Sequence, residues 1–227
     1  MRNLILCGGI FHAFEESSNA LARELASIGV QSSIECDLHK GIEYLADTRF
    51  DLLTVNALRW EMIGEKYDPY REQEAFHITE RQRTLIRSHV ERGGALLALH
   101  TASICFSDWP EWSNILGGAW EWGQSWHPAP CAISVSATAS SLFQPAAFEV
   151  VDELYTDLKL SRAVDVELVG QCDAVDTPQP VMWRHAYGKG RVVYDSLGHD
   201  ARSLSQLSHA EVLRSAVAWS LENRSPG

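Results

Sequence analysis

The chain has 227 residues, a formal net charge of −11 and a hydrophobic content of 45%. A chain of this length can bury a core without disulfides or metal staples, and we assign residues 1–227 to a single domain. An acidic chain repels phosphate groups, so nucleic acids and membrane surfaces are not expected partners. No apolar run reaches the ~18 residues of a membrane span. The apolar start is also too short for a signal peptide, so we expect a cytoplasmic protein.

Strands and helices alternate in the first half of the chain. Apolar runs predict strands over residues 3–9, 32–36 and 50–56. Apolar residues at helical spacing predict a helix over residues 16–28. Thr79 and Gln82 form a capping box for a second helix, which stops at Gly93-Gly94 before an apolar strand at 95–99. This alternation is typical of βαβ units, in which a parallel sheet is covered on both faces.

The second half of the chain has fewer helix signals and more turn markers. Residues 181–185 and 191–195 are predicted to form a hairpin through the turn Gly188-Lys189-Gly190. Ser208 with Glu211 predicts the cap of a last helix. Two long stretches fit no strand or helix, residues 57–77 and residues 108–130, and the second contains five tryptophans. Long loops of this kind are usually functional or interfacial.

Four histidines fall at or near the ends of predicted strands. His12, His100 and His199 follow such strands, and His127 lies in the tryptophan-rich stretch. Ligands of open parallel sheets bind outside the carboxyl ends of the strands, and imidazole serves both proton transfer and metal binding. The pattern favours one shared site. The alternative is that each ring bonds to its own loop.

The cofactor prediction rests on missing motifs. The metal-binding motif HExxH is absent. Whether the four histidines hold a divalent metal such as zinc is therefore left open. The five cysteines include no CxxC pair, which argues against a cysteine zinc site and against a disulfide framework. Gly8-Gly9 lacks the GxGxxG spacing, so neither NAD nor FMN is expected.

Three segments form a specific combination. They are Gly93 to His100 (GGALLALH), Val151 to Tyr155 (VDELY), and the set from Pro180 to His199 that includes Trp183. Together they resemble the trehalose-utilisation (ThuA-like) family. The resemblance covers most of the chain and implies an α/β fold of the flavodoxin-like, class I glutamine amidotransferase-like type. In that fold a mostly parallel central sheet is the middle one of three layers.

Departures from the amidotransferase pattern argue against glutamine hydrolysis for this chain. Amidotransferases carry a cysteine nucleophile on the turn after a strand, where this sequence has His100. Cys105 lies five residues further on, and the acid two residues after the catalytic histidine is missing behind His199. Amide hydrolysis of this kind needs a thiolate activated by histidine, so we do not expect it here.

The resemblance also implies roles for single residues. His100 and His199 are expected at the catalytic centre, with Glu153 as candidate base. Residues expected to bind substrate or line the site are His12, His127, Tyr155 and Trp183. The alternative for Glu153 is a surface acid that caps a turn, and for the aromatic residues an ordinary core position.

We therefore expect an enzyme of carbohydrate metabolism that acts on a sugar or an oxidised (keto) sugar by isomerisation or hydrolysis. The alternative is a non-catalytic sugar-binding or assembly module on the same fold, because fold does not fix function. The expected partner is a small-molecule carbohydrate. Whether the chain forms a homo-oligomer is left open.

Overall fold

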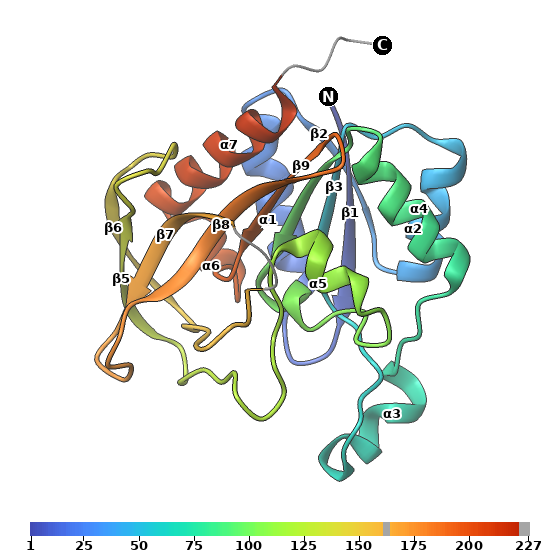
Figure 1. Ribbon diagram of the computed structural model, residues 1–227, viewed down its shortest axis with the longest axis horizontal. Helices are drawn as coiled ribbons and strands as arrows, with labels where there is room; N and C mark the ends of the chain where they lie inside the picture. Colours follow the sequence, from blue (N-terminus) through green and yellow to red (C-terminus); the bar gives the residue numbers. More distant parts are fainter. Residues whose placement is uncertain (161–163, 223–227) are drawn as a thin grey trace.

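The computed structural model describes residues 1–160 and 164–222. Within these residues nine strands form one sheet, in the order β2-β1-β3-β4-β9-β8-β7-β5-β6 (Figure 1). The strands are β1 Arg2–Gly9, β2 Gln31–Glu35, β3 Leu52–Leu58, β4 Ala95–Leu99, β5 Cys131–Ala137, β6 Ala147–Asp152, β7 Asp165–Gln171, β8 Gln179–Tyr187 and β9 Gly190–Asp195.

The sheet is mixed, so the α/β class is confirmed but the prediction of a mostly parallel sheet is wrong. Strands β2, β1, β3, β4 and β9 pair in parallel. From β9 outward, β8, β7, β5 and β6 pair antiparallel with their neighbours. Parallel pairing needs a long crossover, usually a helix, and no helix lies among the described residues between β5 and β9. These strands therefore turn back on their neighbours.

Helices cover both faces of the sheet. Helices α1, α6 and α7 pack on one face, and α2, α4 and α5 lie on the other (Figure 1). The helices are α1 Phe14–Ala26, α2 Leu38–Asp47, η1 Glu65–Tyr67, α3 Asp68–Glu74, α4 Glu80–Glu91, η2 His100–Ser103, α5 Glu111–Leu116, α6 Ala201–Leu204 and α7 Leu207–Leu221. Each face has its own core of buried apolar side chains.

The helix starts show where local sequence signals held and where they did not. Helix α4 begins at the predicted capping box of Thr79 and Gln82. The predicted box of Ser208 and Glu211 is wrong, because the cap of α7 lies two residues earlier, at Gln206, whose side chain accepts from the His209 backbone N–H. Helix α2 was not predicted. It is short and includes a glycine, Gly41, that packs closely against Leu6.

The centre of the sheet leads directly into the candidate site. All five residues of β4 are buried, and the chain turns sharply after Leu99 into η2. His100 takes a φ of 46° in this turn, a conformation that non-glycine residues rarely adopt. Strained backbone of this kind is concentrated at functional sites.

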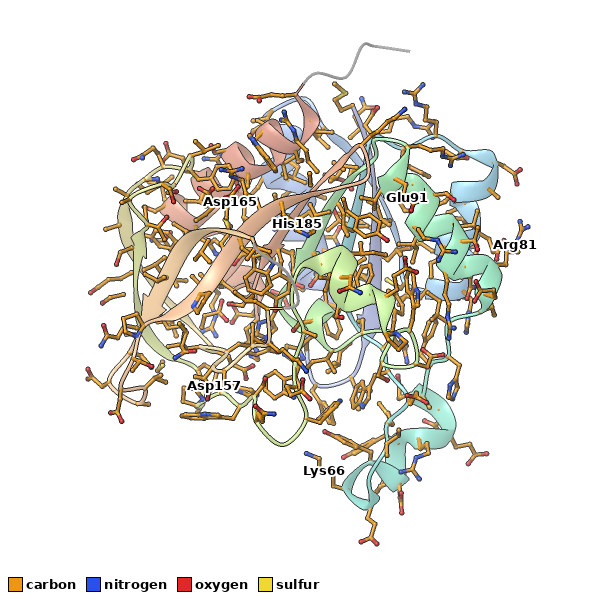
Figure 2. The ribbon with its side chains drawn as sticks, viewed as in Figure 1. Lys66, Arg81, Glu91, Asp157, Asp165 and His185 are labelled. Atoms are coloured by element: carbon orange, nitrogen blue, oxygen red, sulfur yellow. The ribbon has the colours of Figure 1, made fainter. Side chains whose placement is uncertain are left out.

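Many charged side chains lie on the outside of the molecule. Figure 2 shows Lys66 and Arg81 at its periphery, whereas His185 lies among the elements near α5. The His185 ring is buried, and its Nε2 lies 2.9 Å from the Ile115 carbonyl oxygen. His185 is therefore a packing residue.

Candidate functional site

Four side chains from distant parts of the sequence meet at one edge of the sheet. His12 follows β1, His100 follows β4, Glu153 follows β6 and His199 follows β9. One nitrogen or oxygen atom from each lies within 4.8 Å of those of the other three. The His12 ring centroid is 4.7 Å from that of His199 and 5.2 Å from that of His100. The convergence predicted from the strand ends is therefore present.

Glu153 lies at the middle of the imidazoles. Its Oε2 is 3.3 Å from His100 Nε2 and 3.5 Å from His127 Nδ1, and its Oε1 is 3.5 Å from His199 Nδ1. Burial raises the pKa of Glu153, but the neighbouring His100 and His199 outweigh burial and leave the pKa well below its usual range. The side chain is thus a buried carboxylate, and in this state it is a weak proton acceptor.

The loop after β9 is held in place by the neighbouring acid. Asp152 accepts hydrogen bonds from the backbone N–H groups of Gly198, at 2.7 Å, and His199, at 3.3 Å. Strand β6 is the outermost strand of the sheet, so these bonds connect the residue at its end to the loop that follows β9. They bring Glu153 and His199 to the same place.

The tautomer of His100 follows from its partners. Its Nδ1 lies 2.6 Å from the Ser196 carbonyl oxygen, which only accepts hydrogen bonds, so Nδ1 carries the proton. In the neutral ring, Nε2 then presents a lone pair, 3.2 Å from the Tyr155 hydroxyl and toward Glu153. His100 is almost completely buried.

His12 and His199 each present a buried ring nitrogen with no hydrogen-bond partner within the described residues. These atoms are His12 Nε2 and His199 Nδ1. The other nitrogen of His12 lies 3.4 Å from the Ile10 carbonyl oxygen. Burial and then the charges of His100 and His199 lower the pKa of His12 to about 4, whereas Glu153 raises the pKa of His199. Buried polar atoms without a partner are uncommon and call for an explanation.

Tyr155 and His127 flank the cluster. The Tyr155 ring is buried, and its centroid lies 4.4 Å from that of the His100 ring. Burial raises the pKa of the Tyr155 phenol well above the usual value. His127 is more exposed, and its Nδ1 lies 2.9 Å from the Pro128 carbonyl oxygen. Both residues reach the cluster from the side, as expected of residues that contact a bound molecule.

Trp183 is not on the rim of the cluster, contrary to the prediction. Its side chain is fully buried in the core, stacks on Tyr194 at 4.3 Å, and donates a hydrogen bond to the Leu116 carbonyl oxygen. It comes from the middle of β8, away from the strand end. Because helices cover both faces of the sheet, a residue in the middle of a strand is buried whichever face its side chain takes. The tryptophan at this position therefore marks the core and not the site.

A chain of aromatic rings from the two long stretches noted in the sequence runs from the cluster to the surface. Trp120 lies 5.0 Å from Tyr155, and Trp122 lies 6.2 Å from Trp120. Trp60 and Tyr67, from the other long stretch, follow at 6.4 and 6.3 Å from Trp122. Trp122 is 49% exposed, and Tyr155 lies beside His100. The series therefore connects the solvent-exposed surface with the cluster.

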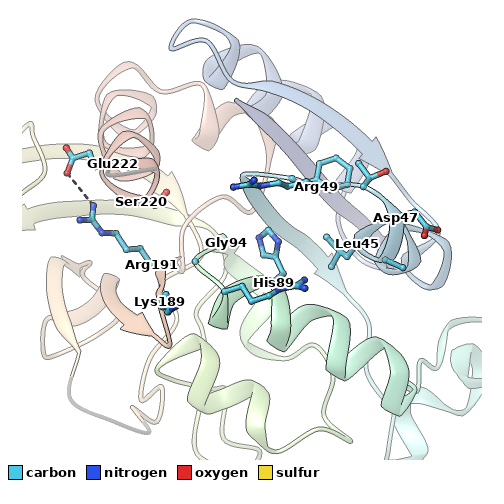
Figure 3. Close-up of a pocket in the computed structure, with 14 residues that line it drawn as sticks. Leu45, Asp47, Arg49, His89, Gly94, Lys189, Arg191, Ser220 and Glu222 are labelled. Atoms are coloured by element: carbon cyan, nitrogen blue, oxygen red, sulfur yellow. Dashed lines mark hydrogen bonds and ion pairs between the residues drawn. The ribbon is translucent and has the colours of Figure 1, made fainter. Parts of the chain in front are cut away.

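Two hollows lie at opposite edges of the sheet. One of about 650 Å³ is lined by His12, by the end of β1 and by the start of α1. A larger one of about 860 Å³ is lined by residues at or just before the starts of β3, β4 and β9, including Arg49, Lys189 and Arg191 (Figure 3). Ligands of such sheets bind at the carboxyl ends of the parallel strands, so the hollow at His12 lies on the side expected for a ligand, and His12 is the member of the cluster that lines it.

Cys105 has no nucleophilic role in this arrangement. It is buried, and its thiol donates to the Ala57 carbonyl oxygen at 3.0 Å. Burial raises the pKa of Cys105 to about 12, so the thiolate is not formed near neutral pH. The position after β4 offers an imidazole in place of a nucleophile.

Comparisons with known proteins give the following relationships. A family model described as ThuA, trehalose utilisation, matches residues 15–220. A ThuA-like protein from Parabacteroides merdae is 16% identical, with a TM-score of 0.74, over 100% of this chain and 92% of its own. A cytoplasmic protein from Salmonella typhimurium is 15% identical, with a TM-score of 0.59, over 96% of both chains. Part of a beta-galactosidase from Rahnella is 15% identical, with a TM-score of 0.61, over 96% of this chain and 30% of its own. Comparison with curated protein sequences gave no match.

Proposed function

Because the chain belongs to the ThuA (trehalose utilisation) family, we propose that it is an enzyme of carbohydrate metabolism. Its substrate is a sugar or a keto sugar, and the reaction is isomerisation or hydrolysis. The observation that carries the proposal is the buried carboxylate of Glu153 within 3.5 Å of three imidazoles. A carboxylate is buried among polar groups at a high cost, and such clusters are concentrated at catalytic sites.

The cluster suits chemistry in which protons move to and from oxygen and carbon. Isomerisation of a sugar shifts a proton between neighbouring carbons, and hydrolysis delivers one to a leaving oxygen. Both reactions need a donor and an acceptor held within hydrogen-bond reach of the substrate. His100 and His199 are placed on either side of Glu153 and supply imidazoles for this exchange. Glu153 orients them and offsets the positive charge that either gains.

The surroundings of the cluster suit a sugar. Its hydroxyl groups find hydrogen-bonding partners in Tyr155 and His127, and its apolar C–H faces find rings in Trp120 and Trp122. Ligand sites commonly combine an aromatic lining with a small number of placed polar groups. We therefore assign substrate binding to His12, His127, Tyr155, Trp120 and Trp122, without Trp183.

The accompanying proposals concern partners and location. A small carbohydrate is the proposed partner, and the net charge of −11 disfavours nucleic acid and anionic membranes. No helix in the described part of the chain is long and apolar enough to cross a bilayer. We propose a cytoplasmic location. The oligomeric state is a matter for measurement in solution.

The test is a screen for binding and turnover. Sugars and their keto derivatives are first ranked by thermal shift, since a ligand that binds the folded state raises its apparent stability. Those that bind are then followed by NMR for conversion. We expect conversion by the wild type and a loss of at least ~100-fold in His199→Gln, the scale of losing a positioned proton-transfer group. Binding without conversion, unchanged by His199→Gln, would establish the sugar-binding module instead.

A further inference from the structure

We infer that His12, His100, Glu153 and His199 bind one divalent transition-metal ion, with zinc as the expected ion. The ligand atoms are His12 Nε2, His100 Nε2, His199 Nδ1 and the Glu153 carboxylate. The binding itself stands on the geometry of these atoms. Its use in sugar chemistry rests on the function proposed above.

The first argument is the number of acceptors that face one another. His12 Nδ1 and His100 Nδ1 point to backbone carbonyl oxygens, so their Nε2 atoms present lone pairs to the cluster. The Glu153 carboxylate can only accept. The Tyr155 hydroxyl can donate to His100 Nε2, but His12 Nε2 and His199 Nδ1 are buried and have no hydrogen-bond partner among the described residues. One cation satisfies all of them at once.

The second argument is the separation of the atoms. Ligands about 2.1 Å from a tetrahedral zinc lie about 3.4 Å from each other. Glu153 Oε2 is 3.3 Å from His100 Nε2, and the other carboxylate oxygen, Oε1, is 3.5 Å from His199 Nδ1. All four atoms lie within 4.8 Å, so only a small inward movement of the widest pair completes the set.

The third argument is the outer contacts of the ligands. Metal-bound histidines usually donate their other N–H to a carbonyl or carboxylate, which fixes the ring. His100 does so to Ser196 at 2.6 Å, and His12 lies 3.4 Å from Ile10. The loop of His199 is held by Asp152 through backbone N–H groups. The cluster therefore has the supporting contacts of a metal centre.

The donor set identifies the class of metal. Three imidazoles and one carboxylate suit zinc and its transition-metal neighbours, whereas magnesium and calcium prefer oxygen donors. A metal here would polarise a sugar carbonyl or hydroxyl, or a water, as a Lewis acid. With the ion bound, His100 and His199 would be ligands and would no longer exchange protons, so proton transfer would pass to His127 and Tyr155, which lie outside the ligand set beside Glu153 and His100.

The experiment measures metal without any substrate. The chain is prepared without a histidine tag, stripped with chelator, and titrated with zinc and with cobalt, whose visible absorption reports nitrogen and oxygen coordination. We expect saturation at about one ion per chain and a lower melting temperature after chelation. Glu153→Gln and His12→Gln should each weaken binding by more than the ~10–100-fold that outer contacts cost. His77→Gln, at an exposed imidazole outside the cluster, should leave it unchanged.

The outcomes are distinct from those of the sugar screen. Absence of saturable binding by the wild type overturns the inference. So does equal binding by wild type and both ligand variants, each shown to be folded by circular dichroism. Turnover of a sugar that persists after complete chelation leaves the enzyme proposal standing and removes the metal. Stoichiometric metal with no conversion of any sugar does the reverse.

Discussion

The Nε2 atom of His100 lies 3.3 Å from Oε2 of Glu153, although both side chains are almost completely buried. His100 reaches this place through the sharp turn after β4, and Glu153 reaches it from the last strand of the sheet. Two residues more than fifty positions apart thus define the centre of the cluster. Without a proton or a cation between them, a lone pair faces a carboxylate.

Replacing Glu153 by glutamine tests the charge at this centre. The amide keeps the size of the side chain but removes the negative charge that attracts His100, His127 and His199. We expect a loss of at least ~100-fold in kcat/KM on the sugar identified by the screen, with a native circular dichroism spectrum. Asp200→Asn is the matched control, because this acid pairs with Arg202 next to the cluster. An equal loss in the control would argue for a general electrostatic effect.

Tyr155→Phe tests the hydroxyl group that lies 3.2 Å from His100 Nε2. The ring and its contacts with Trp120 and His127 are retained, so we expect stability to change by no more than about 1.5 kcal/mol, the net value of one hydrogen bond. If the hydroxyl takes part in proton transfer, kcat should fall at least tenfold with little change in KM. A rise in KM with unchanged kcat would make Tyr155 a binding residue only. The measurement is steady-state kinetics of both proteins.

The site residues that directly follow a predicted parallel strand could be predicted from the sequence. His100 and His199 follow apolar strands, and loops after parallel strands meet at one edge. Glu153 follows an antiparallel edge strand, and its position depends on long-range bonds between Asp152 and the backbone of Gly198 and His199. No local pattern encodes such bonds. Only the resemblance placed Glu153 at the site.

The same distinction explains the errors in the fold. The parallel half was predictable because its strands are apolar runs and two of them are followed by helices with a clear period or cap, α1 and α4. The order β9-β8-β7-β5-β6 was not, since pairing across the sheet is set by tertiary packing and short connections. Trp183 was misplaced for a related reason. An aromatic residue in a strand carries no mark of whether it faces a site or a core.

Trp122→Ala tests the aromatic rings between solvent and the cluster. Its ring lies 6.2 Å from Trp120 and 6.4 Å from Trp60, and it is 49% exposed. A stacked ring contributes about 1 kcal/mol beyond its buried area, so we expect KM for the sugar to rise about five- to tenfold while kcat is kept. Trp126→Ala is the control, at a ring of similar exposure on the same stretch. Equal changes in KM for both variants would contradict a specific stacking role.

The buried pair of Asp195 and His209 supports the site from behind. His209 Nε2 lies 2.8 Å from Asp195 Oδ2, both side chains are completely buried, and Nδ1 lies 2.9 Å from the Ser203 carbonyl oxygen. Asp195 precedes Ser196, whose carbonyl oxygen accepts from His100. Breaking a buried ion pair from one side costs about 3–5 kcal/mol, so we expect Asp195→Asn to lower the free energy of unfolding by that amount. Urea unfolding near pH 6 measures it.

The same pair gives stability a dependence on pH. Burial lowers the pKa of His209, but the charge of Asp195 and the hydrogen bond to it outweigh burial and raise the pKa above the usual 6.5. The charged ring therefore stabilises the folded state fully below pH 6.5, and this contribution is lost as the pH rises through the raised pKa. Urea unfolding from pH 6 to pH 9 should show a decline in the wild type that is smaller in His209→Gln, which cannot take up a proton. Parallel declines in the two proteins would show that His209 is neutral in the folded chain throughout this range.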